Sequence, residues 1–140
     1  MELTRRNMML AGTSAFAVAT FCGIPVLASA VDEYIADFTG GVDAVAGVIE
    51  LDAPEIAENG NTVPITVSAP GASSIMILAA GNPVPAVATF NFGPMSAARS
   101  GSTRIRLAKT QDVIAVAKME DGSFQTTQAT VKVTIGGCGG

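Results

Sequence analysis

The feature that most constrains this chain is an alternation of apolar and polar residues with a period of two. Val63, Ile65 and Val67 alternate with polar residues and a proline, and similar alternation recurs in segments 88–92, 104–107 and 131–135. Successive side chains of a β-strand point to opposite faces, so this pattern predicts strands with one buried and one solvent-facing side. The chain is therefore expected to fold mainly into β-sheets.

Two other runs are apolar at every position. They cover residues 75–78 and 113–117, and they are typical of central strands that are covered on both faces. Turn residues separate the strands, and Asp121-Gly122 predicts a hairpin after the second run. Pro64 has no N–H to donate, so its strand is predicted to lie at a sheet edge.

A short helix is predicted before the strands, over residues 32–39. Tyr34, Ile35 and Phe38 share one face at helical spacing, and Gly40-Gly41 follows as a terminator. Six or more short strands with frequent turns favour a β-sandwich. The predicted fold is all-β: an immunoglobulin-like antiparallel β-sandwich over residues 31–135, with this short N-terminal helix and a flexible C-terminal arm over residues 136–140.

The first 30 residues have the order of a secretory signal peptide. Arg5-Arg6 precedes an apolar stretch that ends in Ala28-Ser29-Ala30, which predicts export to the periplasm and cleavage after Ala30. The arginine pair resembles a twin-arginine signal, which exports folded proteins. A membrane anchor over residues 8–30 is the weaker reading, because glycine, proline and small residues dilute the apolar stretch. Lipidation at Cys22 is rejected because bulky Phe21 precedes it.

Charge and composition exclude several classes of function for the mature chain. Removal of residues 1–30 leaves 6 basic and 11 acidic residues, a net charge of 6 − 11 = −5. With no basic run, neither nucleic acid nor a membrane surface is expected as a partner of the mature chain. The chain has no histidine, which excludes Ser-His-Asp and Cys-His nucleophiles and most zinc sites. Neither a cofactor nor a metal is therefore expected. Asp112, Glu120 and Asp121 are the nearest approach to a carboxylate cluster and are interpreted as turn acids.

The last five residues, Gly136-Gly137-Cys138-Gly139-Gly140, carry the main chemical candidate. Cys138 is the single cysteine of the mature chain, and an unpaired exported thiol either reacts or pairs with another molecule. From Gly136 through Cys138 an extended chain of three residues reaches about 10 Å, at roughly 3.3–3.6 Å per residue. The glycines make this arm thin enough for a narrow channel. The sequence thus predicts a thiol that is presented to other proteins.

Other readings of this ending stay open at this stage. The tail could be incidental, or it could join two copies through a Cys138 disulfide, which would suit an exported structural or adhesive immunoglobulin-like module. A prenylation signal would need the cysteine one position earlier. The final Gly-Gly is also found in ubiquitin-like sulfur carriers, but an export signal and the absence of a helix crossing a sheet argue against that class.

Longer motifs identify a family. The ending VKVTIGGCGG closely resembles the C-terminus of SoxY, the carrier of the bacterial thiosulfate-oxidising (Sox) system. The stretches PEIAENGNTVPITV, GNPVPAVATFNF and STRIRLAKTQDVIAVAKMEDGS resemble the same family in the same order. The resemblance covers most of residues 52–140 and the twin-arginine leader, whereas residues 31–47 match less distinctly.

The resemblance implies a non-catalytic carrier that binds sulfur intermediates covalently at Cys138. In the family, a c-type cytochrome joins thiosulfate oxidatively to this cysteine, and a manganese-dependent hydrolase then releases sulfate. The remaining sulfane sulfur is oxidised or passed on by a further enzyme. The resemblance also implies a heterodimer with a SoxZ-like subunit, which would account for export in the folded state.

Overall fold

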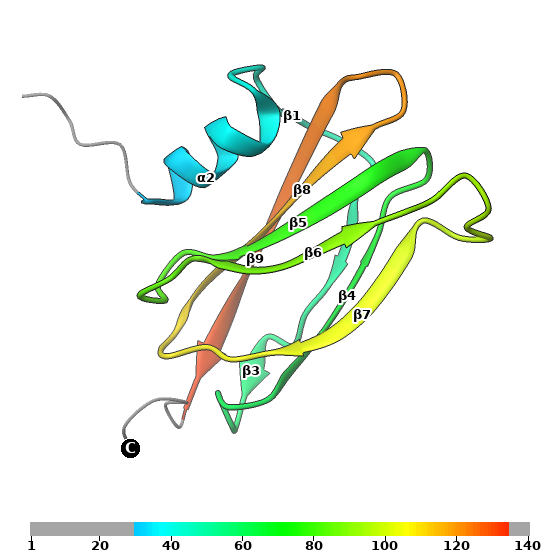
Figure 1. Ribbon diagram of the computed structural model, residues 1–140. Helices are drawn as coiled ribbons and strands as arrows, with labels where there is room; N and C mark the ends of the chain where they lie inside the picture. The colour runs from blue at the N-terminus through cyan, green and yellow to red at the C-terminus, as the bar shows by residue number, and fades with distance from the viewer. Residues whose placement is uncertain (1–29, 135–140) are drawn as a thin grey trace, which may run out of the picture.

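The computed structural model describes residues 30–134, which form one helix and nine strands (Figure 1). Residues 1–29 of the signal peptide predicted over residues 1–30 lie outside this range, and Ala30, the predicted cleavage point, is the first residue of the helix. The elements are α2 (Ala30–Thr39), β1 (Val45–Ala46), β2 (Glu50–Asp52), β3 (Ile56–Ala57), β4 (Val63–Ser68), β5 (Ala72–Ala79), β6 (Ala86–Asn91), β7 (Ser100–Ile105), β8 (Gln111–Met119) and β9 (Phe124–Val133).

The strands form two sheets that pack face to face (Figure 1). The larger sheet has the order β1-β9-β8-β5-β6, with β3 also paired to β9, and the smaller sheet has the order β2-β4-β7. The predicted hairpin joins β8 to β9, where Met119 N–H donates to Ser123 O at 2.8 Å and Gly122 adopts a φ of 86°. The predicted β-sandwich is confirmed.

The core lies between the sheets, as the two continuous apolar runs predict. These runs form β5 and β8, which pair with each other over seven positions in the middle of the larger sheet. Their inward side chains meet those of β4 and the end of β7 in one buried cluster. Fully or almost fully buried members include Val63, Ile65, Val67, Ile75, Ile77, Leu107, Val113 and Val131.

The strand pairing of the segment from residue 45 to 57 was not predicted, and this segment joins the two sheets along one side. Its first and last parts, β1 and β3, pair in parallel with the start and the end of β9. Between them, β2 pairs antiparallel with β4 in the other sheet. The sandwich is therefore mixed at this side, although its long strand pairs are all antiparallel as predicted.

The edge position predicted for the strand of Pro64 is wrong. That strand, β4, is the central strand of the smaller sheet, with β2 on one side and β7 on the other. A proline is possible in this central strand because β2 is short and pairs only with Thr66, Val67 and Ser68. Pro64 pairs with Arg104 of β7 and lies beyond the end of β2, so the proline is tolerated where β4 has no neighbour on that side.

Helix α2 lies over the outer face of the larger sheet (Figure 1). It begins two residues before the predicted start, and it ends at Gly40 and Gly41, both with positive φ. Gly41 N–H donates to Ala36 O, the pattern of a Schellman C-cap. Phe38 packs edge-to-face on Phe124 with ring centroids 6.0 Å apart. No helix within residues 30–134 has the length and apolarity to cross a membrane.

The two sheets approach closely where β6 faces β7. A Cβ atom added at Gly101 of β7 would lie 2.6 Å from the ring of Phe90 on β6, which is closer than carbon atoms pack. We expect Gly101→Ala to lower the free energy of unfolding by about 1–3 kcal/mol, because the ring must shift out of its packed position. Chemical denaturation measures this change. Gly93→Ala is the matched control, since no atom lies within 4 Å of its added Cβ, and an equal loss in both variants would contradict the explanation.

Candidate functional site

The predicted attachment residue Cys138 and the arm residues Gly136, Gly137, Gly139 and Gly140 lie outside the described residues. The structure instead defines the base from which this tail departs. That base is the end of β9, where Val131 is fully buried and Val133 is half-buried against the core. The alternation predicted at 131–135 thus marks the last part of a longer strand that begins at Phe124.

Strand β3 holds one side of this base. Lys132 N–H donates to Glu55 O at 2.9 Å, and Thr134 N–H donates to Ala57 O at 3.1 Å. The Thr134 hydroxyl also donates to Ala57 O at 3.4 Å. Backbone pairing therefore continues to the last described residue, so the six residues that follow start from a fixed point on the sandwich.

Thr110 holds the other side. Its hydroxyl oxygen accepts a hydrogen bond from Val133 N–H at 2.9 Å, and the hydroxyl donates to Val133 O at 3.4 Å. Thr110 directly precedes β8, so this side chain continues the pairing of β8 with β9 beyond the last backbone pair, Gln111 with Val131. Sequence reasoning did not single out Thr110, because a threonine in a loop carries no recognisable signal.

The motif PEIAENGN, which has no evident chemistry in the sequence, supplies part of this base. Its first half forms β3, and its second half forms a turn in which Asn59 Oδ1 accepts from Asn61 N–H at 3.0 Å. Gly60 O accepts a hydrogen bond from Leu107 N–H, which ties the turn to the end of β7. A hollow of about 450 Å³ lies over this segment, and Pro54, Pro64 and the 57% exposed Ile56 contribute apolar surface to it.

We expect Thr110→Val to loosen the end of β9 without disturbing the remaining core. The substitution keeps the shape of the side chain and removes both hydrogen bonds to Val133, at a cost of about 1–2 kcal/mol. Hydrogen exchange should quicken most at Val133 and Thr134. Thr89→Val on β6, whose exposed side chain forms no hydrogen bond in the described structure, is the control. Unchanged exchange at Val133 in Thr110→Val would contradict the role of this residue.

The three carboxylates noted in the sequence do not form a cluster. Asp112 lies at the start of β8 and accepts a hydrogen bond from Thr130 Oγ1 at 2.5 Å. Glu120 lies beyond the other end of β8 and forms an ion pair with Arg99 at 2.7 Å. Asp121 accepts hydrogen bonds from the hydroxyl and N–H of Ser123, and these bonds lower the pKa of Asp121. Each of the three carboxylates therefore has a partner of its own, and Asp112 lies within β8 rather than in a turn.

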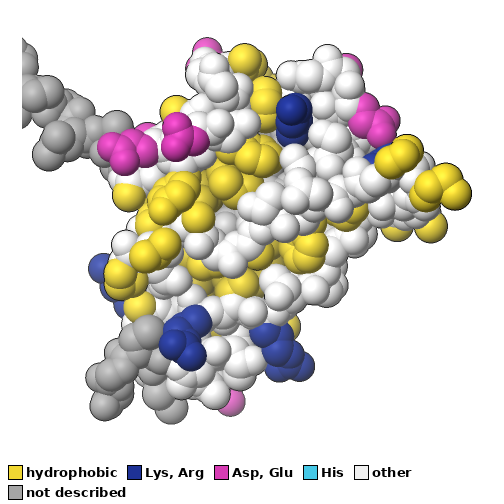
Figure 2. All heavy atoms as spheres, viewed as in Figure 1, with side chains coloured by type: hydrophobic (Ala, Val, Ile, Leu, Met, Phe, Trp, Pro, Cys, Tyr) yellow, Lys and Arg dark blue, Asp and Glu magenta, His cyan; other side chains and the backbone are white. Residues whose placement is uncertain are grey.

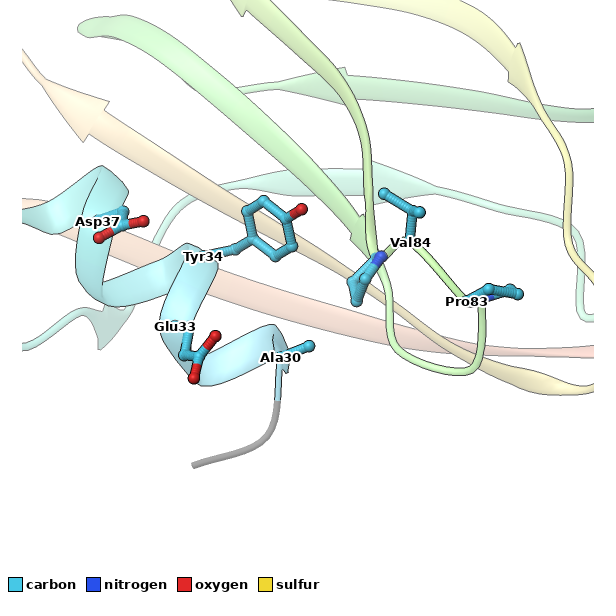
Figure 3. A pocket seen from close by; sticks show the side chains of 7 residues that line it. Ala30, Glu33, Tyr34, Asp37, Pro83 and Val84 are labelled. Atoms are coloured by element: carbon cyan, nitrogen blue, oxygen red, sulfur yellow. The ribbon is translucent and has the colours of Figure 1, made fainter. Parts of the chain in front are cut away.

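A second hollow, of about 330 Å³, lies between α2 and the connection from β5 to β6 (Figure 3). Tyr34 projects from the helix toward Val84, and Glu33 and Asp37 also line the hollow. No residue of β9 contributes to it. Among residues 30–134, no group of three or more His, Cys, Asp or Glu side chains is arranged to hold a metal ion.

The fold and this base define a class: a β-sandwich domain whose last strand is fixed on both sides and leads into a short tail with one thiol. The model of the family described as "Sulfur oxidation protein SoxY" matches residues 35–138, so the match includes Cys138. The chain belongs to the SoxY family. No curated protein matches the sequence significantly.

Solved structures agree with this assignment. The sulfur carrier protein SoxY from Chlorobium limicola f thiosulfatophilum is 38% identical, with a TM-score of 0.67 over 76% of this chain and 98% of that chain. A superoxide reductase (neelaredoxin) from Ignicoccus hospitalis is 17% identical, with a TM-score of 0.55 over 62% of this chain and 80% of that one. A protein from Pyrococcus horikoshii OT3 is 12% identical, with a TM-score of 0.51 over 69% and 98%. The last two show a shared fold alone.

Proposed function

We propose that this protein is a periplasmic carrier that binds sulfur intermediates covalently at Cys138 and presents them to the enzymes of thiosulfate oxidation. The observation that carries the proposal is the family match, which extends through the last strand to Cys138. The Chlorobium relative, a sulfur carrier protein, supports the same function. The fixed end of β9 suits this role, because it gives the tail a defined starting point.

The chemistry follows from a thiol and thiosulfate. Loading joins the Cys138 sulfur to the outer sulfur of thiosulfate, forming one S–S bond, releasing the thiol proton and passing an electron pair to a c-type cytochrome. Hydrolysis by a manganese-dependent enzyme then adds water to the terminal sulfur, breaks the bond between the two thiosulfate-derived sulfurs and releases sulfate with two protons. A persulfide stays on Cys138 until a sulfane-oxidising enzyme removes its outer sulfur.

In this scheme the carrier supplies no acid, base or metal of its own. Cys138 forms and gives up the bonds, and the neighbouring glycines add little bulk when the tail enters an active site. We further propose a heterodimer with a SoxZ-like subunit and export by the twin-arginine route, with cleavage after Ala30. Such a route would allow the partner subunit to leave the cytoplasm already bound.

Mass spectrometry of the native protein tests the proposal. The protein is purified under non-reducing conditions from cells grown with and without thiosulfate, and the C-terminal peptide is analysed. We expect adducts of sulfur or thiosulfonate composition on monomeric Cys138 only in the thiosulfate culture, removable by a reducing agent. A stable Cys138 disulfide between two copies in both cultures would instead support the structural module and would refute the carrier.

A further inference from the structure

Basic side chains gather at the end of the sandwich from which the tail departs. Of the six basic residues in the described range, four lie on β7, on the connection from β7 to β8, or at the end of β9; they are Arg104, Arg106, Lys109 and Lys132. Hydrogen bonds bring these segments together at the tail base: Thr110 contacts Val133, and Leu107 contacts Gly60. Figure 2 shows Lys and Arg side chains at this lower end of the molecule.

These four side chains are exposed and form no ion pair with any described residue. The contrast with the rest of the domain is marked, because the mature chain has a net charge of 6 − 11 = −5. Arg99, at the far end of β7, is half-buried and paired with Glu120. Three carboxylates, Glu55, Glu58 and Asp112, also lie near the tail base, and Glu58 lines the hollow, but none of them forms an ion pair with these four side chains. The four form an unpaired basic rim.

The rim borders the apolar hollow already described. Arg104 pairs with Pro64 across β4 and β7, and its guanidinium donates to Thr62 Oγ1 at 3.4 Å. Thr62, Pro64 and the exposed Ile56 all line the hollow. An apolar centre with a charged rim is the usual anatomy of a protein–protein interface.

The length of the tail determines what must touch this surface. Cys138 lies four residues beyond the fixed Thr134, so its Cα can reach at most about 13–14 Å from the sandwich at roughly 3.3–3.6 Å per residue. An enzyme that accepts Cys138 into a recessed active site must therefore bring the entrance of that site against the end of the domain. The basic rim would then lie against the entrance.

We propose that the basic rim, with the hollow beside it, is the surface on which the domain docks against an acidic entrance of the enzymes that process Cys138. This inference rests on the proposed carrier function and adds the location and charge of the docking surface. Opposite charges on two such surfaces raise the association rate and orient the partners before contact. An acidic domain that had no such rim would be repelled by an acidic entrance.

Lys109 and Lys118 provide a matched test, because both are exposed and lie at opposite ends of β8. Each Lys→Glu substitution changes the net charge equally. Loading of Cys138 with thiosulfate by the purified cytochrome of the same organism is followed by mass, at several carrier concentrations and at low ionic strength. We expect R106E/K109E to lower kcat/KM about tenfold or more through KM, K109E to have a smaller effect, and K118E to change it by less than about twofold.

Two further measurements exclude other causes. R106K/K109R keeps both charges, so its loading should equal that of the wild type. A melting temperature of R106E/K109E equal to that of the wild type excludes a fold defect as the cause of its slower loading. Salt should remove the difference between R106E/K109E and the wild type, because the Debye length falls from about 30 Å at 0.01 M to about 3 Å at 1 M. Equal effects of K109E and K118E, or no effect of R106E/K109E at low salt, would overturn the docking surface. A wild-type protein that is not loaded at all would refute the carrier function itself.

Discussion

Cys138→Ser is expected to abolish the turnover of thiosulfate by the reconstituted system. A serine hydroxyl cannot form the S–S bond that holds the cargo, so no intermediate can be attached. The fold should be unchanged, because the residue lies four positions beyond the last described contact, at Thr134. Thiosulfate consumption by the purified components, with wild-type or variant carrier, measures the effect.

The comparison requires proof that the variant still engages its partners. Cys138→Ser should co-purify with the proposed SoxZ-like subunit to the same extent as the wild type, and it should compete with the wild type for loading when present in excess. Turnover that persists with Cys138→Ser as the only carrier would show that the sulfur intermediates are bound elsewhere.

Replacing both Gly136 and Gly137 by valine is the second change with a large expected effect. Two β-branched side chains stiffen the chain and add bulk directly before Cys138. Processing by the partner enzymes should fall about a hundredfold, since small misplacements in a confined active site have effects of that size. The rate of loading per carrier, followed by mass, measures the loss.

The labelling of Cys138 by a small thiol reagent is the control for this variant. The reagent needs no channel, so its rate should stay close to that of the wild type. The melting temperature should be unchanged or slightly higher, because valine restricts the unfolded chain more than glycine does. Enzymatic loading at the normal rate would mean that the glycines are not needed for entry into the active sites.

Much of the sandwich was predictable because its signals are local. Alternation with a period of two follows directly from strand geometry, and it predicted β4 and the end of β9. The uninterrupted apolar runs predicted β5 and β8 as central strands, and Gly40-Gly41 predicted the end of α2. Each of these features depends on residues within one element, so the sequence of that element is sufficient.

The base of the tail could not be predicted because it depends on pairing between distant segments. Ile56 and Ala57 form a two-residue strand whose partner, β9, lies about half the chain away. Nothing in their own sequence indicates a parallel partner, and the hydrogen bonds of Thr110 to Val133 arise only from the packing of a loop against β9. The edge position predicted for the strand of Pro64 was wrong for a related reason. A proline lacks an N–H wherever it lies, but the sequence does not indicate where the neighbouring strand β2 ends.

The site was predicted from composition and motif rather than from packing. A single cysteine among four glycines made Cys138 the candidate for the reactive residue, and the resemblance to SoxY supplied its proposed chemistry. The basic rim escaped prediction because its members are spread between Arg104 and Lys132, and no stretch of sequence is strongly basic. Only the meeting of β7, β8 and β9 at one end brings these charges together.

The most direct test of the carrier function is a pulse and chase of sulfur on Cys138. Reduced protein is loaded by the partner enzymes with thiosulfate carrying an isotopic label in its outer sulfur, and unlabelled thiosulfate is then added. The carrier function predicts that the label appears on the C-terminal peptide and then leaves it at the rate of overall turnover. Label that never appears on Cys138, or that stays there while turnover continues, would contradict it.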